Sequence, residues 1–147
     1  PIKQAVPNET VWLDELKIEF LAPLQFYDTM NNNSVVVKLT YGDTSFLMMG
    51  DAEKEEEQDL LNSGANLQAD VIKIGHHGSK TSTTQEFLNA VQPDMAVISV
   101  GPDKNELPKS EVLQRLEASN VKTYRTDSSG TVIFMSDGAD ITVATEQ

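Results

Sequence analysis

Short apolar runs separated by polar stretches set the strongest limit on how this chain folds. Nearly continuous apolar residues occupy 46–49, 71–74 and 95–100, and strands of this kind are typical of sheets whose faces are covered by other elements. The stretch after each run has helical spacing, which indicates strand–helix–strand units. The sequence therefore predicts an α/β fold, a mixed sheet with flanking helices, in which residues 46–49 are buried on both faces.

Local signals give the bounds of the predicted elements. Ser82 or Thr83 with Glu86 forms a capping-box pattern, and Gly64 is suited to ending a helix. Helices are expected over residues 52–63, from Ser82 or Thr83 to residue 91, and over 110–119. Strands are expected over residues 16–21, 34–41, 44–50, 69–75, 95–100, 121–124, 131–135 and 141–144. Pro23 makes the first of these an edge strand, and the turn Gly42-Asp43 should join the next two as a hairpin.

The charge balance limits the partners that the chain can hold by electrostatics alone. Its 23 Asp and Glu against 11 Lys and Arg give a net charge of −12, which argues against broad adhesion to phosphate backbones or anionic lipid. Any nucleic acid would therefore need a local binding site. The densest acidic run follows Asp51, and its glutamates, Glu53, Glu55, Glu56 and Glu57, are expected to form the solvated first turns of a helix.

Length and composition exclude several other classes of protein. The 147 residues fit one domain, and the absence of Cys rules out disulfides, thiolate zinc sites and cysteine nucleophiles. No apolar run approaches the ~20 residues of a membrane span. The sequence opens at Pro1 without an initiator Met or a signal-like segment, so we expect any targeting or anchoring segment to lie outside it.

The residues best suited to chemistry follow two of the predicted strands. The only histidines, His76 and His77, stand between Gly75 and Gly78 after one apolar run, and Asp51 follows another. Strand-end loops flanked by glycine are common positions for active-site groups, and both loops offer side chains that bind metals. Two alternatives stay open from spacing alone: Asp51 as a helix N-cap, and the histidines as a hydrogen-bonded turn.

The linear order of five local patterns resembles one family. The match extends over about residues 16–143, and its most specific elements are Gly50-Asp51 and the segment from His76 to Ser79. The five patterns begin at Asn31 (NNNSVVV), Phe46 (FLMMGDAE), Val71 (VIKIGHHGSKTS), Val97 (VISVG) and Tyr124 (YRTDSSGT). Together they resemble the C-terminal part of the metallo-β-lactamase-fold domain of ComEC/Rec2 competence proteins and their stand-alone relatives.

The resemblance implies a larger domain of which this chain is one part. Such a domain is an αββα sandwich of two similar halves with one or two metal ions, zinc or manganese, in the cleft between them. Residues 1–147 are then a single partial domain, the C-terminal half, without the His-x-His/Asp-x-Asp-His cluster of the first half. With three protein ligands usual at a catalytic zinc, we do not expect this half alone to bind metal tightly.

Family roles carry over to specific positions. Asp51 takes the place of an aspartate that can bridge two metals, and His77, or alternatively His76, takes the place of the downstream metal-binding histidine. The resemblance thus implies Asp51 and His77 as catalytic residues. If the strand stays extended, the two histidine rings point to opposite sides.

Other residues are assigned to contact with the substrate, on less specific patterns. A polar turn formed by Asn32, Asn33 and Ser34 resembles the family's turn near the cleft, and Ser79 and Lys80 are candidates to contact a phosphate or leaving group; all five are also ordinary turn residues. One departure stands in the segment from Asn105 to Lys109. Leu107 occupies the place of a histidine that many relatives have, and leucine neither binds metal nor moves a proton.

The functional expectation is a metal-dependent hydrolase. The resemblance implies a phosphodiesterase or nuclease linked to DNA uptake, with DNA or another phosphodiester as substrate of a longer protein that is membrane-attached or extracytoplasmic in a bacterium. Two alternatives remain: a hydrolase of small phosphoesters, or a non-catalytic half-domain that pairs with itself or with the missing N-terminal half.

Overall fold

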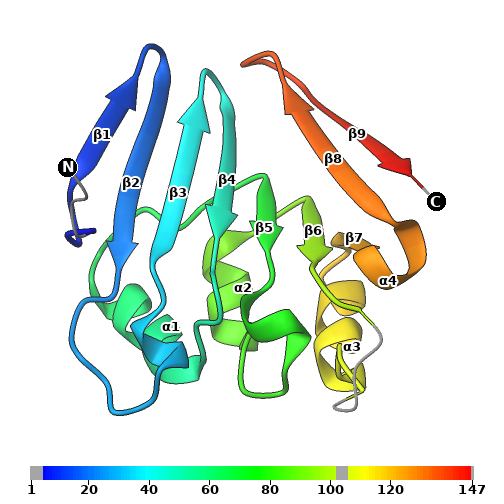
Figure 1. The fold of residues 1–147 in the computed structure, drawn as a ribbon, viewed down its shortest axis with the longest axis horizontal. Helices are drawn as coiled ribbons and strands as arrows, with labels where there is room; N and C mark the ends of the chain where they lie inside the picture. The colour runs from blue at the N-terminus through cyan, green and yellow to red at the C-terminus, as the bar shows by residue number, and fades with distance from the viewer. Residues whose placement is uncertain (1–4, 102–105, 147) are drawn as a thin grey trace.

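A computed structural model describes residues 5–101 and 106–146 of the chain as a seven-stranded sheet and a separate two-stranded hairpin (Figure 1). The strands are β1 (Thr10–Leu13), β2 (Leu16–Ala22), β3 (Val36–Tyr41), β4 (Thr44–Met48), β5 (Val71–Lys73), β6 (Met95–Ile98), β7 (Lys122–Arg125), β8 (Thr131–Ser136) and β9 (Ile141–Glu146). The helices are α1 (Lys54–Asn62), α2 (Gln85–Val91), α3 (Ser110–Ala118) and the single turn α4 (Thr126–Ser129), and two 3-10 turns are η1 (Asn31–Asn33) and η2 (Gly75–Gly78).

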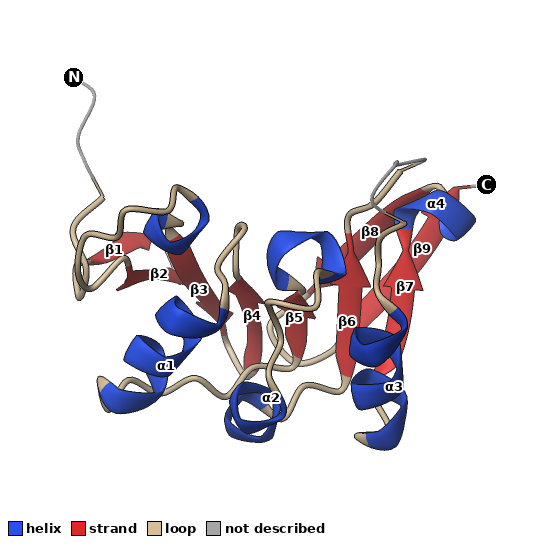
Figure 2. Cartoon of the chain, turned by 90° about the horizontal axis from the view of Figure 1, so that it is seen from below, coloured by secondary structure: helices blue, strands red, loops and turns tan. Residues whose placement is uncertain are grey.

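The seven strands lie in the sheet in the order of the chain. Strands β1 to β4 pair antiparallel, and β4 to β7 pair parallel. The three parallel connections run through α1, α2 and α3, which all lie on one side of the sheet (Figure 2), as expected when every crossover has the same hand. The predicted α/β fold with a mixed sheet and flanking helices is confirmed.

The tight hairpin is also confirmed, and its turn is locked by a second hairpin. Tyr41 pairs with Thr44 across the Gly42-Asp43 turn, and Gly42 has a positive φ of 57°, which glycine adopts at no steric cost. The N–H of Asp43 donates to the carbonyl of Gly138 at 2.6 Å, and a Cβ at Gly42 would lie 2.2 Å from that oxygen. The tips of β3–β4 and β8–β9 are therefore packed together.

The hydrophobic core lies between the sheet and the three helices. Strand residues such as Leu47, Ile72 and Ile98 are buried there against Phe87 and Leu116 from the helices. Each of these strand residues alternates with a neighbour that points to the opposite face, as the period of a strand requires. The core therefore stabilises only one face of the sheet.

The opposite face is apolar and only partly covered. Phe46 and Tyr124 on this face contact Phe134 of the β8–β9 hairpin edge to face, with ring centroids 6.3 and 5.7 Å apart. A cavity of about 540 Å³ remains between hairpin and sheet, lined mainly by Leu16, Leu39, Tyr41, Phe46, Met48, Val71, Val97 and Phe134. Met48 keeps 38% of its surface exposed, so the expectation that residues 46–49 are buried on both faces is wrong. The helices cover only the other side.

Two local expectations also differ from the structure. The predicted edge strand is interior, because β1, which was not predicted, pairs with it and takes the edge. Helix α2 is capped by Thr84, whose side chain accepts the N–H of Phe87, rather than by Ser82 or Thr83. Thr83 has a positive φ of 54° and turns the chain before the helix starts.

In the described ranges no helix has the length and apolar character needed to cross a bilayer.

The acidic run after Asp51 is less exposed than its composition suggests. Only Glu55 among its four glutamates is exposed, while Glu56 and Glu57 are each 1% exposed. Glu57 accepts the backbone N–H groups of Thr83 and, at 2.9 Å, Thr84. Glu57 therefore joins α1 to the start of α2, which a solvated glutamate would not do.

Glu56 is buried without comparable compensation. Within the described residues, neither carboxyl oxygen has a hydrogen-bond partner. Burial raises the pKa of Glu56 to about 8; the nearby N–H of Ser34 offsets part of this rise and the charge of Asp59 adds to it. At neutral pH the carboxyl is therefore mainly protonated, which avoids the cost of a buried, unpaired charge.

We predict that Glu56→Gln removes a pH-dependent loss of stability. The folded protein holds a proton on Glu56 up to pH about 8, whereas a glutamate in the unfolded chain loses it near the ordinary pKa of about 4.3. The stability contributed by the protonated group is complete below the unfolded pKa and falls as the pH rises through the folded one. Urea unfolding should show the variant more stable than the wild type by about 1–3 kcal/mol at pH 9 and nearly equal at pH 4.5. Glu117→Gln, at an exposed glutamate, is the control. An equal gain in the free energy of unfolding at both pH values would contradict the titration of Glu56.

Candidate metal centre

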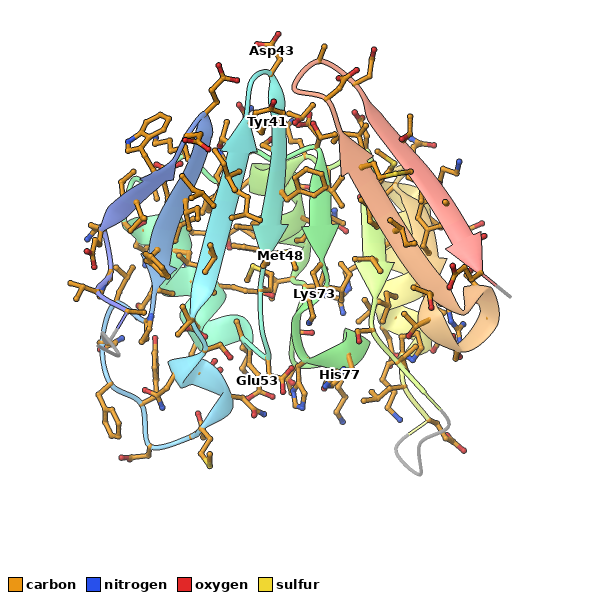
Figure 3. All side chains as sticks on the ribbon, turned by 45° about the horizontal axis from the view of Figure 1, so that its top comes forward. Tyr41, Asp43, Met48, Glu53, Lys73 and His77 are labelled. Carbon is orange, nitrogen blue, oxygen red and sulfur yellow. The ribbon has the colours of Figure 1, made fainter. Side chains whose placement is uncertain are left out.

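The candidate site lies where β4 and β5 end, at the edge of the sheet where parallel strands present their carboxyl ends (Figure 3). Gly50 has a positive φ of 57° and directs the chain from β4 into Asp51. The N–H of Asp51 donates to Ser34 Oγ at 3.0 Å. A Cβ at Gly50 would approach that side chain to 3.1 Å. Ser34 therefore supports the backbone of Asp51 through a contact that favours glycine at position 50.

Both histidines lie in a left-handed turn. The sequence pattern allows an extended strand here, which would point the two rings to opposite sides, and the chain does not form one at these residues. Strand β5 ends at Lys73, and His76 and His77 have φ values of 44° and 54°. Their ring centroids are 6.4 Å apart with an interplanar angle of 65°. Gly78 continues the turn with φ of 77°, and a Cβ there would lie 2.5 Å from Pro108 Cβ. The turn is thus fixed by close packing.

His77 and Asp51 face one another. His77 Nε2 lies 3.5 Å from Asp51 Oδ1, and each side chain is 43% exposed. His77 Nδ1 lies 2.6 Å from the carbonyl oxygen of Ser99, which can only accept, so Nδ1 carries a proton and Nε2 is the ring nitrogen on the side of Asp51. Two ligands at ~2.0–2.2 Å from one ion lie within about 4.4 Å of each other. The pair therefore fits two positions around one cation.

His76 is held by a different carboxylate. Its Nδ1 lies 2.9 Å from Glu53 Oε1, and Thr81 Oγ1 donates to the same oxygen at 2.5 Å. Asn31 Nδ2 lies 3.4 Å from His76 Nε2. A carboxylate on one ring nitrogen fixes both the tautomer and the orientation of a histidine. His76 is therefore oriented independently of the Asp51–His77 pair, and of the two histidines it is His77 that lies closer to Asp51.

A lysine ties the two strand-end loops together. Lys73 Nζ donates to the carbonyl oxygens of Gly50 at 3.1 Å and Ile74 at 3.2 Å. Burial lowers the pKa of Lys73, and the charge of Asp51 partly offsets this effect. The ammonium group therefore bridges the segment that leads into Asp51 and the segment that leads into the histidines.

The residues predicted to contact substrate divide into supporting and outward-facing groups. Asn33 uses its side-chain amide on the preceding loop, accepting the N–H of Tyr27 at 2.9 Å and donating to the carbonyls of Tyr27 and Thr29, both at 2.7 Å. Asn32 is buried and accepts the N–H of Glu53 at 3.1 Å.

On the histidine side, the hydroxyl of Ser79 lies 3.0 Å from that of Thr81 and so joins the His76–Glu53 network. Lys80 is exposed. The structure therefore gives Ser34, Asn32, Asn33 and Ser79 structural hydrogen bonds, and leaves the side chain of Lys80 at the surface.

Several groups around the site were not found from the sequence. Glu53 is expected from the sequence to lie in a solvated helical turn, yet it is the N-cap position of α1 and its side chain is 16% exposed. Its place before the helix, two residues after Asp51, is a signal that could have pointed to a role. Ser99 acts through its backbone carbonyl and Asn31 through an amide among ordinary turn residues, so neither carries a distinctive side-chain signal.

The described residues bring together two side chains of types that bind metal ions. Among them there is no group of three or more His, Asp or Glu side chains arranged to hold an ion. Asp51 oxygen and His77 nitrogen are donors that suit zinc or manganese. Lys109 N–H donates to Gly78 O at 2.9 Å, so the segment of Leu107 lies beside the histidine turn. Asn105, at the start of that segment, lies outside the described residues.

Known proteins match both the sequence and the fold. The family model of the Metallo-beta-lactamase superfamily matches residues 2–101. ComE operon protein 3 of Bacillus subtilis is 38% identical over 90% of this chain, and Competence protein ComA of Neisseria gonorrhoeae 37% over 82%. Recombination protein 2 of Haemophilus influenzae is 38% identical over 69%. The chain spans only 19%, 18% and 13% of these three proteins.

The solved structure of CmlA, a diiron β-hydroxylase from Streptomyces venezuelae, has a similar fold. It matches with a TM-score of 0.57 at 11% identity, over 82% of this chain and 32% of that one, a level of identity that bears on the fold alone. The family model, by contrast, extends from before β1 to the end of β6 and includes Asp51 and both histidines. The chain therefore belongs to the metallo-β-lactamase superfamily and is related to the competence proteins of the ComEC/Rec2 family.

Proposed function

We propose that this chain is the C-terminal part of a metal-dependent phosphodiesterase or nuclease domain that acts in DNA uptake. The observation that carries the proposal is the approach of His77 Nε2 to Asp51 Oδ1 at 3.5 Å, with the opposite nitrogen of His77 anchored on Ser99 O at 2.6 Å. The relationship to proteins named for competence supports DNA as the substrate. A hydrolase of small phosphoesters would use the same two residues.

In this proposal Asp51 and His77 hold the ion, and their neighbours fix the geometry. A zinc or manganese ion held there would lower the pKa of a water molecule and so make hydroxide available at neutral pH. Ser34 positions Asp51 through its backbone N–H, and Ser99 orients the ring of His77. If the intact domain held two ions, Asp51 would be the residue proposed to bind both. Ser79, Lys80 and Asn33 remain candidates for contact with the phosphate.

The remaining ligands are assigned to an upstream half of the same domain. A catalytic zinc usually takes three protein ligands, and the described part of this chain brings only Asp51 and His77 together. Residues 1–147 are accordingly proposed to be a partial domain, with the apolar face of Phe46, Met48 and Val97 covered by the other half. We do not expect the isolated chain to retain an ion at working concentrations.

A second candidate function rests on that apolar face. Leu, Phe, Met and Val side chains line a cavity of about 540 Å³ on this face, and contiguous exposed apolar surface often marks an interaction site. A non-catalytic half-domain would use this face to pair with another chain. The metal-dependent interpretation takes precedence because the apolar face alone does not explain why Asp51 and His77 converge at the sheet edge.

We predict that activity requires both the longer protein and Asp51. The chain alone should not hydrolyse a chromogenic phosphodiester or single-stranded DNA with Mn²⁺ or Zn²⁺, whereas the protein that contains the upstream half should. Asp51→Ala in that protein should lower kcat by more than the about 10- to 100-fold cost of losing an outer-shell partner. Calorimetric titration of the metal should show a matching loss of affinity.

Asp43→Ala is the matched control, since Asp43 is an exposed carboxylate at the opposite end of β4 (Figure 3), and it should leave activity and metal affinity unchanged. Robust turnover by the 147-residue chain would overturn the partial-domain proposal. An Asp51→Ala protein with normal kcat would overturn the assignment of Asp51.

We also predict that the isolated chain self-associates through the apolar face, most simply as a two-fold pair. Met48→Lys, which places a charge on this face, should shift the sedimentation coefficient to that of a monomer. Met135→Lys should not, because Met135 is 51% exposed and alternates with Phe134, so it points away from the sheet. A wild-type chain that remains monomeric up to millimolar concentration would contradict this prediction.

A further inference from the structure

The loop between β2 and β3 carries two apolar side chains that neither the core nor the metal centre explains. Phe26 and Met30 are 86% and 90% exposed, the highest values among the large apolar residues that the structure describes. Burial of either side chain would normally be worth about 1.5–3 kcal/mol. Exposed apolar side chains that gather in one place mark interaction sites, whereas scattered ones are ordinary, so the position of this loop decides what the two side chains can do.

The loop is held in place rather than free. Asn33 binds the backbone of Tyr27 and Thr29 through three hydrogen bonds of 2.7 to 2.9 Å. The hydroxyl of Tyr27 donates to the carbonyl of Glu55 at 3.2 Å and to the carboxylate of Asp59 on α1. Phe26 and Met30 flank these anchored residues. The backbone that displays them is therefore fixed from both sides.

The same loop lies beside the candidate site. Met30 immediately precedes Asn31, whose amide nitrogen lies 3.4 Å from His76 Nε2. Residues 23–30 extend below β2 and β3, at the edge of the sheet where the histidine turn follows β5 (Figure 1). A substrate bound at Asp51 and His77 would therefore have its neighbouring groups within reach of this loop.

The charge around the loop selects the kind of contact that it offers. Asp28 lies within the loop, and Glu53, Glu55 and Asp59 stand close behind it. Together with the net charge of −12, these acids disfavour binding through phosphates, which needs Lys and Arg. A nucleic acid at this place would instead be held through its uncharged bases.

We propose that Phe26 and Met30 form a stacking platform for an unpaired base next to the phosphodiester that is cleaved. An aromatic ring offers its face to any base, and a thioether adds a polarizable contact to the base edge. Bases inside a duplex are stacked on one another and would not reach these side chains. The platform therefore takes single-stranded DNA, and the inference rests on the proposed nuclease function for the position of the phosphodiester.

The test measures equilibrium binding, so that it does not depend on turnover. The longer protein carrying Asp51→Ala, which prevents turnover, is titrated into a fluorescent single-stranded oligonucleotide and into the same oligonucleotide with one abasic position moved along it. Phe26→Ala should weaken binding of the intact oligonucleotide about tenfold, Met30→Ala somewhat less, and Phe26→Trp should retain it. Trp12→Ala, which removes a 62% exposed aromatic ring from the distant edge strand β1, is the matched control and should have no effect.

A double-mutant cycle separates stacking from a general loss of affinity. At one position along the oligonucleotide, removal of the base should weaken binding by the protein with Phe26 about as much as Phe26→Ala does. Removing both that base and the Phe26 ring should weaken binding no more than either change alone. Equal binding by the Phe26→Ala and parent proteins, or fully additive effects at every abasic position, would overturn the platform. If the longer protein with Asp51 intact shows no metal-dependent turnover while the cycle gives the expected result, the proposed nuclease activity is overturned and the binding site stands.

Discussion

Parallel pairing of β4, β5 and β6 decides where every other feature of the site lies. Because these strands run parallel, their carboxyl ends meet at a single edge of the sheet, and the loops that carry Asp51 and His77 begin there. The register keeps Met48 beside Lys73, so the two loops leave the sheet at the same level. Lys73 then holds the segment that leads into Asp51, and the carbonyl of Ser99 holds the ring of His77. The position of the site therefore follows from the alignment of the strands, and the side chains only complete it.

The elements of the fold were largely predictable because they depend on local apolar periodicity. Helix α3 was expected over 110–119 and occupies Ser110–Ala118, and the hairpin turn was located by Gly42-Asp43 alone. Strand β1 was missed because its residues are all exposed and carry no alternating burial. The cap of α2 was misplaced by one or two residues because Ser82, Thr83 and Thr84 have nearly equal chemistry, and only tertiary packing at Thr83 decides among them.

The site was predictable only in part, for a different reason. Asp51, His76 and His77 stood out because they are metal-binding residue types at strand ends. What separates the two histidines is a backbone carbonyl at Ser99 and a carboxylate at Glu53, contacts between segments far apart in the sequence. The same limit explains the glutamates of α1. Their buried or exposed state depends on where the helix begins, and a shift of one residue exchanges Glu55 with Glu56.

The left-handed conformation at both histidines also constrains how the turn can change over time. Few residues other than glycine tolerate a positive φ, and Asn, Asp and His are the most frequent among them. Two of these, Asp and His, are also the side chains that bind hard or borderline metal ions. At positions 76 and 77, backbone sterics therefore favour a short set of amino acids that includes histidine. If metal binding at this turn were lost, the positive φ values would still favour Gly, Asn, Asp or His at these two positions.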